Sequence, residues 1–359
     1  MGQTSDVIVV GAGVFGLTAA LAFARAGQNV LLLERAASPG AGASGGLVGA
    51  LSPYMPENWN IRKAAQFRAL RAAPAYWAGV EALGGRSSGY GQTGRIVPLT
   101  TARAAELAPQ RAGFAAELWE GAGLWLVRSA MPDWLNPAAA PYGIVQDTLS
   151  ARIDPALACA AVLAAFRASG GRFAANTHVQ AVQSGRVETA SGILTAPLII
   201  LATGVANWPG MAPMRGVKGQ AALLAGGLPP STPSLYADGI YIIAHASGRV
   251  AIGATSEEDF DDAHSTDGQL DTVLQRAFAL VPALHAQPIV ARWAGVRPRA
   301  PRPEPMLGWV QPGVLAATGG FRTGFALAPL IADALVAMAR GDRPDIPPHY
   351  HMEDHMRPR

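Results

Sequence analysis

Three glycines near the start of the chain have the spacing that binds a pyrophosphate. Gly11, Gly13 and Gly16 follow a short apolar run in the order GxGxxG. In this motif the first glycine allows a tight turn, the second lets a pyrophosphate approach the backbone, and the third lets a helix pack closely on a strand. The free N–H groups and the dipole of the helix N-terminus then hold the phosphates. We therefore expect these glycines, together with Val14 and Phe15, to bind a dinucleotide.

An acidic residue follows at the position where the ribose of a dinucleotide would lie. Glu34 ends a second apolar run, LLLE, and Arg35 comes directly after it. A carboxylate there accepts hydrogen bonds from both hydroxyls of an adenosine ribose and repels a 2′-phosphate. The two motifs together predict FAD or NAD rather than NADP, with a purely structural glycine turn as the alternative.

A second cluster of small residues comes shortly after the acid, in the segment PGAGASGG. Small residues let backbone N–H groups and a hydroxyl approach an extended anionic or planar ligand. A flexible surface loop is the alternative interpretation. We include Ala43, Ser44, Gly45 and Gly46 in the predicted cofactor site.

Two later segments also end in glycine-rich turns. LIILATG is a buried-strand pattern that ends in Thr203 and Gly204, and LAATGGFRTGFALAP is a strand that leads into a long helix near Phe325. The positive end of that helix, aimed at a flavin ring, would stabilise the anion formed on reduction. An ordinary strand exit and a glycine-rich turn without a ligand are the alternatives. We include in the site Gly319, Gly320, Phe321, Arg322, Thr323 and Gly324.

The elements that would position these residues form a βαβ unit. The patterns predict a strand at Asp6–Val10, a helix at Val14–Ala26 and a strand at Asn29–Glu34. Parallel strands need a crossover helix, so the unit predicts a doubly wound sheet covered on both faces. Leu198–Ala202 is expected to be a third strand of this sheet.

The rest of the chain, outside the strands and helix of this unit, has a different pattern of apolar residues. We expect helices around Ile61–Leu83 and Ala102–Leu107, and loops between Leu118 and Pro141. Ile240–Ala244 and Arg249–Ala254 alternate around a Ser-Gly turn, which predicts an antiparallel hairpin. The sequence thus predicts two interleaved domains: a dinucleotide-binding domain (1–85, 145–215 and 300–359) and a mostly antiparallel substrate domain (86–144 and 216–299).

Composition excludes several classes of protein. The 359 residues are 50% hydrophobic, enough for two cores, and a net charge of +3 with no Lys/Arg run argues against a nucleic-acid partner. No apolar run is long enough to span a membrane, and no signal-peptide pattern opens the chain, so we expect a cytoplasmic protein. The single cysteine, Cys159, rules out an internal disulfide and is expected to be a core residue. The tail histidines, His349, His351 and His355, lack the spacing of metal ligands, so we expect no metal and a disordered tail.

From the first glycine motif to the C-terminal helix, the chain resembles the D-amino-acid oxidase superfamily of FAD enzymes, and within it the glycine oxidase and sarcosine oxidase branch. The resemblance rests on motifs in one order: GAGVFG with Glu34, GASGG, ATG at 202–204, IYIIAHASGRVAIGATSE at 240–257, WAGVRPRAPRPEPMLG at 293–308 and ATGGFRTGFALAP at 317–329. It implies an α/β fold in which a Rossmann-like FAD-binding domain, of the glutathione reductase type, is interleaved with an α+β substrate domain.

The resemblance also implies roles for individual residues. Tyr241 and Arg297 occupy the places that bind a substrate carboxylate, Arg322 lies beside the flavin, and Val179 joins the cofactor site. Cys159 is not where sarcosine oxidases link their flavin, so FAD is expected to be noncovalent.

The chain departs from the family pattern at four positions. Ala244 and His245 replace a common Pro-Arg pair, Gly320 replaces a histidine, and Arg302 replaces an acid. Arg302 would either favour a more acidic substrate or be solvated.

The implied reaction is oxidation of the C–N bond of a small amine or amino acid to an imine, with dioxygen as acceptor. A dehydrogenase that passes electrons to a quinone or a protein is the first alternative, and a dinucleotide-binding module without oxidase activity is the second. One segment, ASGGLVGALSP, is also similar to the flavin domain of a tRNA-modifying enzyme, but the chain shows no basic patch. A homo-oligomer is left open.

Overall fold

The first apolar run of the chain lies inside a six-stranded sheet. The structure is a computed structural model that describes residues 4–357. Strand β1 (Val7–Val10) pairs in parallel with β2 (Val30–Leu33) and β12 (Leu198–Leu201), as predicted. The order is β18-β19-β12-β1-β2-β8, and every neighbouring pair is parallel except β18 with β19. The remaining strands are β8 (Arg172–Ala174), β18 (Met306–Gln311) and β19 (Val314–Thr318).

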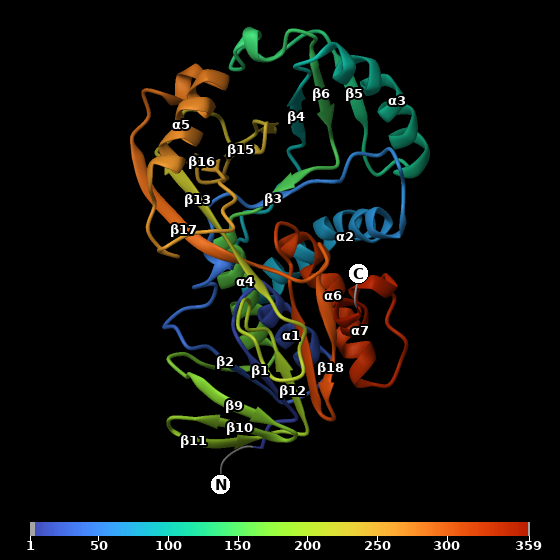
Figure 1. Ribbon diagram of the computed structural model, residues 1–359, viewed down its shortest axis with the longest axis vertical. Coiled ribbons are helices and arrows are strands. Elements are labelled where there is room, and N and C mark those ends of the chain that lie inside the picture. Colours follow the sequence, from blue (N-terminus) through green and yellow to red (C-terminus); the bar gives the residue numbers. More distant parts are fainter. Residues whose placement is uncertain (1–3, 358–359) are drawn as a thin grey trace.

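Alternate residues of β1 enter two different cores. Val7 and Val9 pack with helices on one face, whereas Ile8 and Val10 pack against a three-stranded antiparallel sheet on the other (Figure 1). The sheet is therefore covered on both faces, but a small β-sheet replaces helices on the second face. The helices are α1 (Val14–Arg25), α2 (Ile61–Gly84), α4 (Pro155–Ala168) and α6 (Gly324–Ala339), and the small sheet holds β9 (Val179–Gln183), β10 (Arg186–Thr189) and β11 (Gly192–Thr195).

An eight-stranded sheet forms the other half of the molecule (Figure 1). Its order is β17-β13-β16-β15-β14-β4-β6-β5, and its pairs are antiparallel except for β14 with β4. The predicted hairpin is confirmed as β15 and β16. Helix α5 (Gly268–Leu280) packs on the outer face. The strands are β4 (Arg95–Pro98), β5 (Trp125–Arg128), β6 (Ile144–Asp147), β13 (Arg215–Leu224), β14 (Ser234–Ala237), β15 (Ile240–Ala244), β16 (Val250–Gly253) and β17 (Ile289–Arg299).

The two sheets draw on interleaved parts of the chain. Strands of the six-stranded sheet lie within 7–33, 172–201 and 306–318, and those of the eight-stranded sheet within 95–147 and 215–299. The predicted domain limits stay a prediction, and their outermost residues, 1–3 and 358–359, lie outside the described part. Short strands β3 (Ala50–Leu51) and β7 (Ala151–Arg152) form a separate pair.

Three local expectations were wrong. Helix α3 (Ala102–Leu118) continues through Pro109, because the buried residues Ala108 and Ala115 lie on both sides of the proline and hold the helix in place. Strand β5 forms where only loops were expected.

The third wrong expectation concerns the C-terminal tail, which is packed rather than disordered. It contains α7 (Met352–Met356), and Tyr350 and Met352 are each 1% exposed. Because apolar side chains of the tail fill space beside β18, where His351 bridges to Leu307, the segment has a fixed place. Within residues 4–357, no helix has both the length and the apolarity that a membrane crossing requires, and no group of three His, Cys, Asp or Glu side chains is arranged to hold a metal.

Candidate functional site

The glycine motif lies at the turn from β1 into α1. Gly11 has φ +99°, and a Cβ there would lie 2.5 Å from the carbonyl oxygen of Ala202 at the end of β12. A Cβ on Gly16 would lie 1.8 Å from the carbonyl oxygen of Gly11. Larger residues at either position would separate the helix from the strands, so the local geometry requires glycine.

The second small-residue cluster meets the start of this helix. Gly13 is the N-cap of α1 and offers no side-chain cap, and the Val14 N–H donates to Oγ of Ser44 at 2.9 Å. Ala43–Gly45 form a short 3-10 turn. Two segments about thirty residues apart in the sequence therefore converge on one helix N-terminus, where an anion is favoured.

Glu34 lies at the carboxyl end of β2 and is 9% exposed. Its Oε2 accepts the Ala12 N–H at 2.7 Å and its Oε1 accepts the Ala36 N–H at 2.9 Å. Arg35 is exposed, whereas Val179, on β9, is buried beside this end of the sheet. The carboxylate thus has a fixed place next to the glycine turn.

The third and fourth predicted segments also meet. Thr318, which precedes Gly319, donates its hydroxyl to the carbonyl oxygen of Gly204 at 2.7 Å. Thr203 accepts a hydrogen bond from the Trp208 indole at 2.9 Å. The two glycine-rich turns thereby join the end of β12 to the end of β19.

The segment before α6 is shaped by aromatic contacts. A Cβ on Gly320 would lie 2.8 Å from Cζ of Phe15, so the Phe15 ring takes the space that a histidine would need. Phe321 has φ 41°, and the guanidinium groups of Arg299 and Arg322 lie over its ring, at 5.7 and 5.2 Å from the ring centre. Thr323 and Gly324 then begin the helix.

These features fit a dinucleotide cofactor. The helix N-terminus lacks a side-chain cap of its own, glycines line the approach to it, and a buried carboxylate stands where a ribose would lie. The backbone N–H donors suit phosphates, and the carboxylate, as an acceptor, suits ribose hydroxyls.

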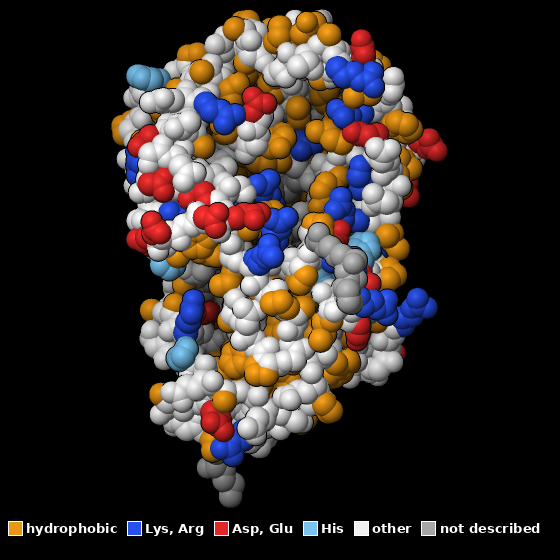
Figure 2. Space-filling model, in the orientation of Figure 1, with side chains coloured by type: hydrophobic (Ala, Val, Ile, Leu, Met, Phe, Trp, Pro, Cys, Tyr) orange, Lys and Arg blue, Asp and Glu red, His pale blue; other side chains and the backbone are white. Residues whose placement is uncertain are grey.

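One face of the eight-stranded sheet is turned toward this cofactor region. Register aligns Tyr241, Gly253, Ala221 and Trp293 in one row across β15, β16, β13 and β17. Directly paired residues share a face, and this face is opposite to the one that packs on α5. A Cβ on Gly46 would lie 3.4 Å from the Trp293 indole, so the row meets the cofactor segment. Figure 2 shows a hollow between the two halves, with lysine and arginine side chains gathered along it.

Arg297 lies on the same face, four residues after Trp293. Its Nη1 donates to the carbonyl oxygen of Thr255 at 3.1 Å. Burial, and after it the nearby Arg322, lower its pKa, Glu257 opposes both effects, and the pKa is lowered to about 10. The guanidinium is still charged at neutral pH, and within the described residues its bonding is to a carbonyl rather than to a carboxylate. Such a group favours an anionic ligand.

Tyr241 and Arg297 are therefore on one face but not in contact, since β16 and β13 lie between their strands. Sequence reasoning missed a third polar group on this face. Arg95 on β4 and Asp147 on β6 form an ion pair of 2.7 Å, and their side chains are 3% and 0% exposed. The available signal in the sequence was one charged residue in each strand, Arg95 at the start of β4 and Asp147 at the end of β6.

Two residues that depart from the family pattern, Arg302 and His245, have partners within the chain. Arg302 donates to the carbonyl oxygen of Asp354 at 2.8 Å and pairs with its carboxylate at 3.1 Å, so the C-terminal tail neutralises this cation. The ring of His245 is buried, with its Nε2 2.8 Å from the carbonyl oxygen of Leu47. Cys159 is buried as expected, and burial raises the pKa of its thiol to about 12.

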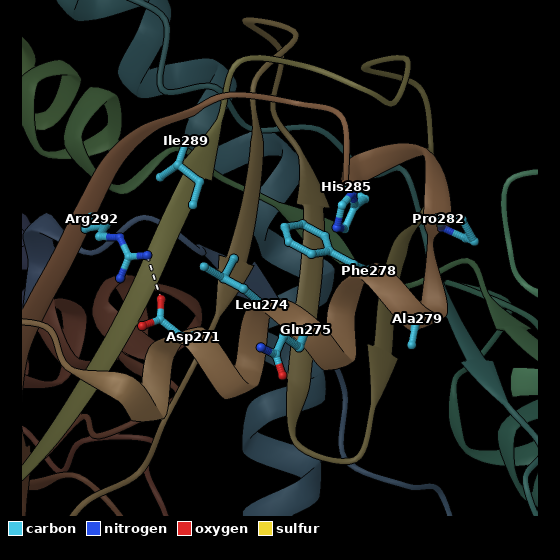
Figure 3. A pocket seen from close by; sticks show the side chains of 9 residues that line it. All are labelled: Asp271, Leu274, Gln275, Phe278, Ala279, Pro282, His285, Ile289 and Arg292. Atoms are coloured by element: carbon cyan, nitrogen blue, oxygen red, sulfur yellow. Dashed lines mark hydrogen bonds and ion pairs between the residues drawn. The ribbon is translucent and has the colours of Figure 1, made fainter.

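A separate groove lies on the outer side of the eight-stranded sheet. It has a volume of about 800 Å³ and is lined by α5 and the start of β17, with Arg292 bonded to Asp271 at 2.6 Å (Figure 3). Because it is on the far face from Tyr241 and Arg297, it is not part of the candidate site.

Several known proteins are similar to this chain in sequence and in structure. A glycine oxidase from Pseudomonas aeruginosa is 30% identical over 96% of this chain and 98% of its own length. The bifunctional protein ThiO/ThiG of Nostoc sp. is 28% identical over 93% of this chain, which spans only 52% of that relative. The solved structure of glycine oxidase from Geobacillus kaustophilus has a TM-score of 0.87 at 24% identity, with 98% of each chain covered.

The family described as DAO, FAD dependent oxidoreductase, matches residues 6–338. That range includes the glycine turn, Glu34, the row through Tyr241, and Arg297 on β17. The chain belongs to this family of FAD dependent oxidoreductases.

Proposed function

We propose that this protein oxidises the C–N bond of a small amine that carries a carboxylate, of the glycine type, and that dioxygen accepts the electrons. The observation that carries the proposal is the partly buried guanidinium of Arg297, which faces the cofactor region without a carboxylate partner among the described residues. An arginine fork can hold a carboxylate through two parallel hydrogen bonds. The relatives named glycine oxidase support an amino acid as the substrate.

FAD would be held without a covalent bond. The glycine turn, Ser44 and Glu34 suit its phosphates and ribose. The single cysteine is buried in α4 with a raised thiol pKa, which disfavours a thiolate link. When bound, FAD supplies the acceptor for the hydride equivalent.

The protein's own groups act by orientation. Arg297 and the Tyr241 hydroxyl bind the carboxylate and thereby fix the α-carbon, which is worth more than any single polar contact because alignment lowers the entropic part of the barrier. The small residues Gly253 and Ala221 lie in the row between Tyr241 and Trp293 and leave room there for a ligand. A substrate amine that arrives neutral needs no side-chain base.

The experiment is a substitution at Arg297. Arg297→Ala should raise KM for glycine-type substrates roughly 100-fold or more, because a charge pair is lost from a buried site, while the yellow FAD spectrum survives. Arg276→Ala, on the far face in α5, is the matched control and should leave KM unchanged. Unchanged KM in Arg297→Ala would refute the assignment. Peroxide formed from substrate and dioxygen alone supports the oxidase, whereas turnover only with an added quinone identifies a dehydrogenase.

A further inference from the structure

The ion pair between Arg95 and Asp147 adjoins the tyrosine of the candidate site. Strand register places Arg95 opposite Asp147 on one side and Ser234 on the other, and Tyr236 opposite Tyr241. The Arg95 guanidinium lies 6.0 Å above the Tyr236 ring, and the Tyr236 and Tyr241 rings are 4.6 Å apart. The Tyr241 side chain also lies close enough to the Arg95 guanidinium to help raise the pKa of Arg95.

Arg95 is held from several directions. Its Nε donates to Oδ2 of Asp147 at 2.7 Å, and its Nη2 reaches the carbonyl oxygen of Pro53 at 3.4 Å. The carboxylate of Asp147 is itself fixed, because its Oδ1 accepts the Ser150 N–H at 2.7 Å. The guanidinium therefore presents its remaining donors in a set direction.

The chemistry of the two groups decides which one donates. A guanidinium has donors only, whereas a phenol has one donor and can also accept. Burial alone would lower the pKa of Arg95, but Asp147 and Tyr241 raise it above its usual value, so the group stays protonated. A charged guanidinium nearby attracts the phenol oxygen of Tyr241, so the hydroxyl hydrogen is directed away from Arg95.

We propose that Arg95 is a positioning residue that makes Tyr241 a donor toward the substrate carboxylate. The proposal rests on the proposed function, since it assumes a carboxylate between Tyr241 and Arg297. It accounts for a buried ion pair on the face of the sheet that carries Tyr241 and Arg297. Stability alone does not explain the pair, because apolar residues of similar volume generally serve as well.

The test measures binding without turnover. Glycolate, which carries a carboxylate and lacks an amine, is titrated into the FAD-loaded enzyme by calorimetry, with glycolamide as its uncharged counterpart. Tyr241→Phe should weaken glycolate binding roughly 10-fold or more, the value of a hydrogen bond to a charged group. Arg95→Lys keeps a cation beside Asp147 but loses the planar fork, and should weaken glycolate binding by a similar factor. Glycolamide binding should change little in either variant.

The double variant decides the mechanism. If Arg95 acts through Tyr241, adding Arg95→Lys to Tyr241→Phe gives no further loss, and in Arg95→Lys alone KM rises while kcat is kept. Independent, additive losses, or wild-type affinity in Arg95→Lys, would overturn the proposal. Arg152→Lys is the matched control, a buried arginine that donates to carbonyl oxygens of Gly89 and Pro230; it should leave glycolate binding unchanged.

If Arg95→Lys does not fold, Arg95→Gln combined with Asp147→Asn removes both charges together, and the same loss of glycolate binding is expected. Wild-type enzyme that holds FAD but binds no glycolate would refute the proposed function itself, whereas wild-type binding with no effect at Arg95 refutes only the positioning role.

Discussion

Gly219→Ala should disable carboxylate binding without removing any functional group. Gly219 lies on β13, opposite Gly295, on the same face as Arg297. A Cβ at this position would lie 2.0 Å from Nη2, 2.2 Å from Cζ and 2.4 Å from Nη1 of Arg297. The guanidinium thus lies directly over the glycine, and a methyl group there would displace it.

The size of the effect follows from these distances. Ordinary contacts between heavy atoms are about 3.5–4.0 Å, so the guanidinium must move by roughly 1.5 Å. A displacement of about 1 Å in a positioning group can cost about 100-fold in rate. The fold should be affected far less, because the end of a flexible side chain moves and alanine also restricts the unfolded chain, by roughly 0.4–1 kcal/mol. We expect glycolate affinity and kcat/KM to fall about 100-fold with a nearly unchanged Tm.

The assay compares Gly219→Ala with Gly113→Ala. Gly113 is exposed on α3, and a Cβ there would meet no atom within 4 Å. Both proteins are examined for FAD content, Tm, glycolate affinity by calorimetry, and KM and kcat. Wild-type glycolate affinity in Gly219→Ala would refute the view that Arg297, in the place described, binds the carboxylate. A large fall in Tm with no loss of affinity per folded molecule would refute it equally.

Further predictions concern the cofactor site and buried groups. Glu34→Gln should weaken FAD binding about 10-fold or more, because an amide has one acceptor oxygen and cannot accept from both the Ala12 and Ala36 N–H groups as well as from ribose hydroxyls. The increase in FAD fluorescence on dilution measures the release of FAD. Unchanged retention of FAD would argue against the ribose role of Glu34. Cys159 should resist Ellman's reagent in the native state and react in urea, since burial raises its thiol pKa to about 12; equal native and denatured rates would contradict this. Burial lowers the pKa of His245 below 6.5. The unfolded state then binds more protons as the pH falls below the unfolded pKa, so stability is complete above about pH 6.5 and declines below it, by at most about 1.4 kcal/mol per pH unit for this group. Urea unfolding from about pH 7.5 to about 5 should show that slope, and a slope unchanged in His245→Gln would exclude this histidine as a source.

The cofactor half was predictable because its signals are local. The turn at Gly11, helix α1 and Glu34 lie within one short βαβ unit, in which each residue type answers a nearby backbone requirement. The small antiparallel sheet over the second face was not predicted, since covering by helices and covering by strands leave the same apolar alternation in β1.

The substrate half was less predictable because its site depends on register. Arg95 and Asp147 are 52 residues apart, and only the pairing of β4 with β6 brings them together. The contact of Arg297 with Gly219 likewise depends on the alignment of β13 with β17. Sequence spacing cannot supply such alignments, because a shift by one residue reverses which side chains share a face. The packed tail was missed because its few buried side chains, such as Tyr350, are too short a pattern to show a period.

The interleaving of the two sheets also dictates when the cofactor site can exist during synthesis. Gly11 contacts the residue that follows β12, and Phe15 contacts Gly320, which is about three hundred residues later in the chain. At the usual rates of translation, roughly 15–60 s separate the emergence of these partners. Until then the apolar face of α1, which packs against α6 in the finished protein, has no permanent cover. The nucleotide-binding motif comes first in the sequence, yet its packing is completed only when the last quarter of the chain has been synthesised.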